Sequence, residues 1–235
     1  MNGLLVRVGI DQTFGGWNSP VDERTKEFVY VPIPENLYGL RRNLVHRYEE
    51  VLVPLRRHGK ELPSELRKRP MHLDPDFSTL TYGDWSRKGK QICKLVPGDL
   101  IAFYAGMRST ARGPRRLVYA LIGLFVVKEI VKALDVPKSR WHENAHTRRK
   151  PHDDDHDIVV RAKADVSGRL SRCIPIGEFR DNAYRVKRDM LKAWGSLSVR
   201  DGYITRSAQI PRFKNAARFY AWFRRQKPKL VRKNN

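Results

Sequence analysis

The chain has 235 residues, a length that suits one large domain or one domain with an extension. Hydrophobic residues make up 40% and charged residues 31%, with 14 Pro and 16 Gly, so the composition excludes a low-complexity or fibrous protein. Lys and Arg number 47 against 25 Asp and Glu, which gives a formal net charge of +22 at pH 7. A polyanion is therefore the first partner to consider.

Other composition signals exclude several classes of protein. Cys93 and Cys173 are too few for a disulfide framework or a four-thiolate zinc site. The first residues lack the pattern of a secretory signal, and no window approaches ~18 uninterrupted apolar residues. We therefore expect a cytoplasmic protein without a membrane partner.

The first third of the chain predicts short strands and one amphipathic helix. Leu4–Ile10 and Glu27–Ile33 are apolar and β-branched, which predicts strands. Apolar residues recur with helical spacing from Leu37 to Leu55, so we expect a helix there that ends near Pro54. The charged segment 56–70 is typical of a surface connection.

The middle of the chain predicts core strands. Residues 96–105 predict a turn that leads into a buried strand, and Leu117–Val131 predicts a long strand interrupted by Gly123. Asp157–Lys163 and Leu170–Ile176 flank a turn and predict a β-hairpin.

The remaining residues complete the predicted architecture. Ala183–Trp194 and Arg212–Arg225 show the apolar spacing of helices. Together these elements predict an α+β fold with a mainly antiparallel sheet, of which a barrel-like sheet with flanking helices is one form. We expect an α+β core of residues 1–177 with a polar pocket, and a basic helical extension of residues 178–235 packed on that core.

The strongest electrostatic signal is the segment Gly202–Asn235, which contains ten basic residues and no acidic one. Lys and Arg neutralise phosphates and release counterions, so the segment predicts contact with nucleic acid. Its aromatic residues, such as Tyr220 and Trp222, either stack on unpaired bases or belong to the core. The basic residues that we select as nucleic-acid contacts are Arg206, Arg212, Lys214, Arg218, Arg224 and Arg225.

Four of the seven histidines lie close together among Asp residues. They are His142, His146, His152 and His156. An i, i+4 pair on a helix puts two imidazoles on one face, and imidazole with carboxylate is a ligand set for a divalent metal. His142 and His146 are therefore candidate ligands for Mg²⁺, Mn²⁺ or Zn²⁺. The alternative is a polar loop whose Asp residues offset the neighbouring Lys and Arg.

A second polar cluster is the segment His72-Leu-Asp74-Pro-Asp76. In an extended backbone alternate residues share a face, so the three polar side chains can converge on a metal, a hydroxyl or a water that needs a general base. Asp before Pro is also a common turn former, which is the alternative. Asp11, before Gly15-Gly16 at the end of the first predicted strand, is the fourth candidate catalytic residue. The two glycines lack the spacing of a Walker loop or a dinucleotide fingerprint.

Four segments together resemble the nucleotide modification associated domain 3 family. They are Gly9–Pro20, Val31–Pro34, His72–Asp76 and Pro97–Leu100. The resemblance extends over residues 4–176 and implies that His142 and His146 correspond to two close histidines of the family. It also implies a setting beside enzymes that modify DNA bases, which are then candidate partners.

A weaker resemblance concerns the fold alone. Gly98–Tyr104 followed by Val118–Gly123 is similar to the core of PUA-like domains, which bind RNA or flipped modified bases in a cleft of a small barrel. This resemblance implies that Trp17, Trp85 or Trp141 encloses a base. A shared fold does not fix a function.

The residues leave three functions open. The first is an enzyme that alters or cleaves nucleic acid, DNA rather than RNA, in a pocket built from the candidate catalytic and metal-binding residues. The second is a non-catalytic reader of modified DNA or RNA bases. The third is a basic structural protein whose polar motifs are turns. The density of His and Asp motifs argues against the third function, and it slightly favours the first function over the second.

Overall fold

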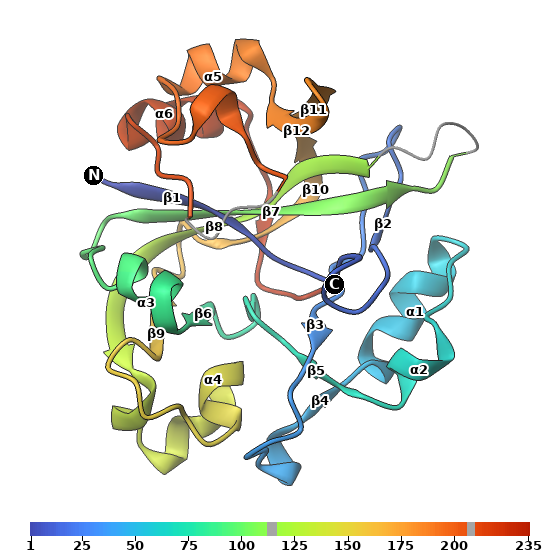
Figure 1. Cartoon of the computed structure of the whole chain (residues 1–235), viewed down its shortest axis with the longest axis vertical. Coiled ribbons are helices and arrows are strands. Elements are labelled where there is room, and N and C mark those ends of the chain that lie inside the picture. The colour runs from blue at the N-terminus through green and yellow to red at the C-terminus, as the bar shows by residue number, and fades with distance from the viewer. Residues whose placement is uncertain (112–116, 206–209) are drawn as a thin grey trace.

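The computed structural model of the protein describes residues 1–111, 117–205 and 210–235. Helices and mostly antiparallel strands form the expected α+β fold, shown in Figure 1. The central sheet has eight strands in the order β1–β7–β8–β10–β13, with β2 beside β7, β9 beside β8 and β6 beside β9. The described strands form an open sheet and do not close into a barrel.

The centre of the sheet is the antiparallel pair β7 (Leu100–Ser109) and β8 (Leu117–Lys132), which confirms the two predicted core strands. Strand β1 (Gly3–Arg7) lies parallel to β7. Both faces of β7 are covered, because Leu100 and Ala102 join one hydrophobic cluster while Ile101 and Phe103 join another. Burial on both faces explains why these strands are nearly continuous apolar runs.

One face of the sheet is covered by α5 (Arg188–Trp194) and α6 (Ala216–Arg225), at the top of Figure 1. Trp194 and Phe219 are fully buried there in the same cluster as Leu5 of β1. The Asn215 side chain accepts the Arg218 amide N–H and so caps α6. The basic segment is thus held to the sheet by its aromatic side chains.

The opposite face is anchored by Phe77, which packs edge-to-face against Phe103 and Phe125. Gly123 of β8 makes room for this ring, because a Cβ at that position would lie 2.4 Å from Cε1 of Phe77. The same loop is held from behind by Asn234, whose side-chain amide accepts the Phe77 N–H and donates to Asp76. These contacts fix the segment that carries the first polar motif.

A smaller antiparallel sheet lies beside this segment, formed by β3 (Ile33–Pro34), β5 (Pro70–His72) and β4 (His46–Arg47). Helices α1 (Glu49–Arg57) and α2 (Ser64–Arg67) pack around a third hydrophobic cluster next to it.

The remaining strands and α-helices are β2 (Pro20–Val21), β6 (Thr81–Asp84), α3 (Ser86–Ile92), α4 (Ala145–Arg148), β9 (Ile158–Ala162), β10 (Gly168–Pro175), β11 (Gly177–Arg180), β12 (Ala183–Val186) and β13 (Leu230–Val231). Four short 3-10 helices are described: η1 (Arg42–Leu44), η2 (Ala133–Asp135), η3 (Lys138–Glu143) and η4 (Arg200–Gly202). None of the helices in the described residues is long and apolar enough to span a membrane.

Two predicted elements in the first third differ from the structure. The helix expected from Leu37 begins only at Glu49, because Leu37 is 69% exposed and the buried apolar positions start at Tyr48. Pro54 lies inside α1 and does not end it. The strand expected over residues 27–33 forms only scattered backbone hydrogen bonds before β3. Phe28 makes an isolated bridge, the Val29 N–H donates to Pro20, and Val31 accepts the Ile10 N–H.

Two further predictions in the second half were wrong. The hairpin expected between β9 and β10 does not form, because β8 is long enough to pair with β9 along one part and with β10 along another. Residues 183–186 are the strand β12, and the helix predicted from Ala183 begins only at Arg188. The division into residues 1–177 and 178–235 stays a prediction.

We expect Gly123→Ala to lower the free energy of unfolding by about 1–3 kcal/mol, because the added methyl group has to displace the Phe77 ring from the sheet. Urea unfolding followed by circular dichroism measures this change. Phe77→Leu in the same chain should make the two losses less than additive, since the smaller side chain leaves room for the methyl group. An unchanged unfolding free energy in Gly123→Ala contradicts the prediction.

Candidate metal site

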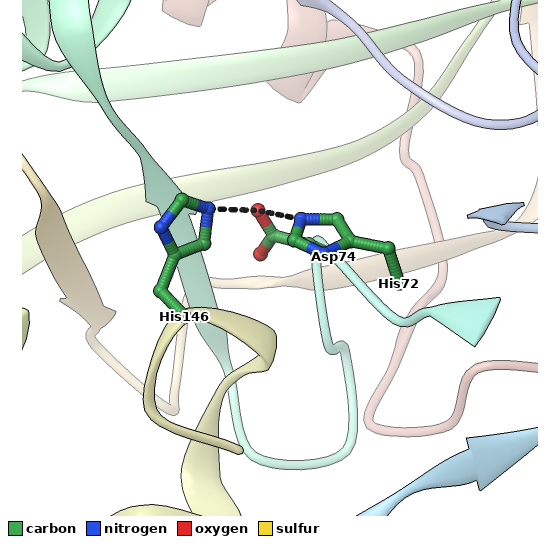
Figure 2. A group of neighbouring side chains, drawn as sticks. All are labelled: His72, Asp74 and His146. Atoms are coloured by element: carbon green, nitrogen blue, oxygen red, sulfur yellow. Dashed lines mark ion pairs between the residues drawn. The ribbon is translucent and has the colours of Figure 1, made fainter. Parts of the chain in front are cut away.

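Three polar side chains from different parts of the chain meet on the sheet face that carries Phe77. His72 ends β5, Asp74 lies in the following loop, and His146 belongs to α4. Nε2 of each imidazole lies 3.9 Å from the same Asp74 oxygen, Oδ2. Figure 2 shows this carboxylate between the two rings. A separation of 3.9 Å is too long for a hydrogen bond, but it suits two ligand atoms that each lie about 2.0–2.2 Å from a shared metal ion.

Both imidazoles are oriented by a second carboxylate on their other nitrogen. His72 Nδ1 lies 2.7 Å from Oε2 of Glu35, and His146 Nδ1 lies 2.5 Å from Oδ1 of Asp157. With Nδ1–H donating to a carboxylate, the lone pair of Nε2 is directed at Asp74. A carboxylate behind each imidazole is the arrangement that orients metal-bound histidines in proteins.

Two hydrogen-bond donors hold Asp74 between the imidazoles that face it. The Gly83 N–H of β6 donates to its carboxylate at 2.9 Å, and Nδ2 of Asn144 donates to Oδ1 at 2.9 Å. Asn144 also caps α4, because its Oδ1 accepts the His146 N–H. A Cβ at Gly83 would lie 2.4 Å from the His146 ring, so a glycine is needed where β6 passes this histidine.

Burial and neighbouring charges shift the pKa values of the three groups in opposite directions. Burial raises the pKa of Asp74 to about 7, although its donors and His72 favour the charged form. Burial lowers the pKa of His146, and the hydrogen bond to Asp157 only partly opposes it. Burial acts on His72 as well, but the hydrogen bond and charge of Glu35 outweigh it and raise the pKa of His72. A divalent cation among these groups would favour the ionised carboxylate and neutral imidazoles.

The donor set indicates which metal the site can hold. Two imidazole nitrogens and one carboxylate oxygen are the protein ligands of catalytic zinc sites and of non-heme iron(II) sites, both of which keep open positions for water or substrate. Magnesium prefers oxygen ligands and fits less well than zinc or iron(II). The arrangement can therefore polarise a substrate or activate a water molecule.

The three side chains line a cavity of about 1250 Å³. Its other walls come from β1 and the turn after it, the loop after β3, the junction of β6 with α3, and residues 149–153. Asp11 lies in this wall, where it forms an ion pair with Arg7 at 2.9 Å and accepts the N–H groups of Thr13 and Phe14. The cavity thus gives the candidate metal site access to a ligand.

Comparison with known proteins identifies the family. The model of the nucleotide modification associated domain 3 family matches residues 2–196. The chain belongs to this family. No curated protein and no solved structure matches it. Membership supplies an association with nucleotide modification.

Two of the predicted polar residues lie away from the three clustered side chains. Asp76 forms a buried ion pair with Arg148 at 2.5 Å and accepts a hydrogen bond from Asn234, and it does not line the cavity. His142 is exposed on the 3-10 helix η3, and the extended backbone of Asn144 separates that helix from α4. His146 therefore meets His72 of β5, and the described arrangement does not pair it with His142.

The predicted nucleic-acid contacts of this family member fall into three groups. Trp17 packs against the third hydrophobic cluster, and Trp141 is covered by the Arg41 guanidinium at 3.5 Å, so neither lines the cavity. Arg206 lies outside the described residues. The others are exposed and form no ion pair within the described chain: Arg212, Lys214, Arg218, Arg224 and Arg225. Buried Phe219 and Trp222 belong to the core beneath them.

Four supporting residues were not recognised from the sequence. Glu35, Gly83 and Arg149 carried no local signal, because their contacts with the site arise only when distant segments meet. Asn144 had a local signal, because it is a residue type that caps helices and it directly precedes a short helical segment. Asp157 is one of several Asp residues near the histidines, and nothing in the sequence distinguishes it from the others.

We expect His72→Ala and His146→Ala to abolish binding of zinc, and Glu35→Ala to weaken it about 10–100-fold by releasing the His72 ring. Isothermal titration of chelator-treated protein measures the affinity. His142→Ala is the matched control, because this histidine belongs to the same segment and is exposed. Loss of zinc binding in His142→Ala, with retention in His72→Ala, contradicts the triad and favours the His142–His146 pair.

Proposed function

We propose that the protein is a metal-dependent enzyme that acts on nucleotide units of nucleic acid, with His72, Asp74 and His146 as the metal ligands. The observation that carries the proposal is the convergence of two Nε2 atoms on one carboxylate oxygen, each imidazole being oriented by a separate buried carboxylate. A buried polar cluster of this composition costs stability unless a cation compensates it. If these polar residues only formed turns, none of these contacts would be needed.

The family supplies the substrate class of this proposal. Association with nucleotide modification makes a base or nucleotide the expected target. A bound zinc ion would lower the pKa of a water molecule for hydrolysis, whereas iron(II) would support oxidation with molecular oxygen as the oxidant. In either case the chain's own part is to hold three ligands on one side and leave the cavity side to substrate.

The basic segment supports a polymeric substrate. Its exposed cations lie on α6 and on the residues before it, and Pro211, which lines the cavity, directly precedes Arg212. A phosphate held by Arg212 would lie close to the cavity, whereas the cations of α6 lie over the other face of the sheet and would contact more distant phosphates of the same strand. We include DNA and RNA in this proposal, with DNA as the expected partner and other nucleotide-modifying enzymes as its expected setting.

A non-catalytic reader of modified bases is the second candidate. It is favoured by exposed aromatic side chains at the cavity, which suit binding of a base without any chemistry. A reader needs no metal, so metal dependence separates the two functions.

We expect purified protein to change the mass of a nucleoside, or the length of a strand, when incubated with plain or base-modified nucleic acid and zinc, iron(II) or manganese. Nucleoside mass spectrometry and strand-length analysis detect these products. Asp74→Asn and His72→Gln should abolish conversion, and Asp165→Asn, an exposed change of the same type, should not.

Full conversion by a folded Asp74→Asn protein removes this carboxylate from the mechanism. Unchanged nucleic acid with every metal, from protein that binds metal, contradicts the enzymatic proposal and favours the reader.

We expect replacement of Arg218, Arg224 and Arg225 by Gln to weaken binding of DNA of any sequence. The slope of log affinity against log salt should fall by about one for each phosphate that the variant no longer neutralises. Fluorescence anisotropy at several salt concentrations gives this slope. The same replacement of Arg56 and Arg57 on α1, which are also exposed, is the control, and an equal loss in both variants contradicts a specific basic surface.

A further inference from the structure

Large apolar side chains are unusually exposed around the cavity. Nine such residues are exposed in the described chain, and four of them line this one cavity: Phe14, Tyr38, Trp85 and Leu134. Exposed apolar surface gathered at a concave site marks a place where a ligand binds. Three of the four side chains are aromatic, which suits a flat ring.

Trp85 is the aromatic side chain tied most closely to the candidate metal site. It follows Asp84 at the end of β6, two residues after Gly83, whose N–H holds Asp74. Its ring stacks on His152, with centroids 4.0 Å apart and planes at 19°, and the indole is still 46% exposed. One surface of the indole is thus supported by protein while much of the ring remains available to a ligand.

His152, which stacks on Trp85, and the candidate metal ligand His146 both form a hydrogen bond with Asp157. Asp157 accepts the His152 amide N–H on Oδ2 at 2.7 Å, while its Oδ1 orients His146. The stacked pair and the ligand histidine are therefore held by the same carboxylate. This places the aromatic wall and the metal-binding atoms in a fixed relation across one cavity.

Two lysines that line the same cavity have no acidic partner among the described residues. Lys88 lies on α3, one helical turn after Trp85, and Lys150 lies two residues after the end of α4, the helix that contains His146. Neither forms an ion pair with any residue in the described parts of the chain, whereas Arg7 and Arg149, also in the wall, are paired with Asp11 and Asp157. Unpaired cations beside an aromatic wall suit an anion attached to a ring.

We propose that this cavity binds one nucleotide unit, with its base stacked on Trp85 and its phosphate at Lys88 and Lys150. The cavity volume of about 1250 Å³ accommodates a whole nucleotide. The assignment rests on the proposed function for the role of the metal, since it names the substrate of the same site. Binding of the base itself does not need the metal, so an experiment can overturn one of the two proposals and leave the other intact.

The test is titration with thymidine 5′-monophosphate, with thymidine, and with a short single-stranded thymidine oligonucleotide, in chelator and then in zinc. Trp85→Ala should weaken nucleotide binding about ten- to hundredfold, as loss of one base–aromatic stack does. Trp85→Phe should retain most of the affinity, but it should lose the quenching of Trp85 fluorescence that a stacked base would cause. Lys88→Gln should reduce the preference for the nucleotide over the nucleoside, because Lys150 alone then faces the phosphate.

Trp141→Ala is the matched control, because this indole lies outside the cavity beneath Arg41. Binding of the monophosphate supports the proposal with a free nucleotide as ligand, and binding of the oligonucleotide alone supports it with a strand as ligand. Unchanged affinity in Trp85→Ala, or no binding of any of the three probes, overturns it. Nucleotide binding by protein that fails to bind zinc leaves this proposal intact and overturns the proposed metal chemistry.

Discussion

Burial of the Asp74 carboxylate is the constraint on which the polar half of the structure depends. Removing a carboxylate from water costs several kcal/mol unless hydrogen bonds or charges replace the lost solvent. The replacements come from β6 through the Gly83 amide, from the cap of α4 through Asn144, and from the charge of His72. Segments that are distant in sequence are therefore held around one carboxylate, and the contacts that satisfy it also assemble a metal ligand set.

The apolar half of the fold was largely predictable because its signal is local. The apolar run of β7 and the length of β8 are visible in the residues themselves, and the two strands pair as expected. Partner choice is different. The prediction that β9 and β10 pair was reasonable from their spacing, but β8 is long enough to pair with both of them. The pairing of such strands depends on which strand edges are free to form hydrogen bonds, and the hydrophobic periodicity of a segment does not show this.

The site was only half predictable for a related reason. His72 and Asp74 were identified because they are two residues apart on extended backbone, which a local pattern reveals. His146 was identified with His142 as its partner because i, i+4 spacing suggests one helix face, but the chain there changes from a 3-10 helix through extended Asn144 to α4. Glu35 and Gly83 act only through tertiary contacts. Trp85 was among the aromatic candidates, and only the structure distinguishes it from Trp141.

Residues beyond the family match contribute to the core and to the polar loop. The match ends at residue 196, yet Phe213 and Phe219 cover the apolar face above β1, and Asn234 holds the loop behind Asp74. A fragment cut where the shared sequence stops would leave an apolar sheet face open to water and would deprive the buried Asp76 carboxylate of one of its donors. The matched residues and the described residues that follow them therefore share one hydrophobic core.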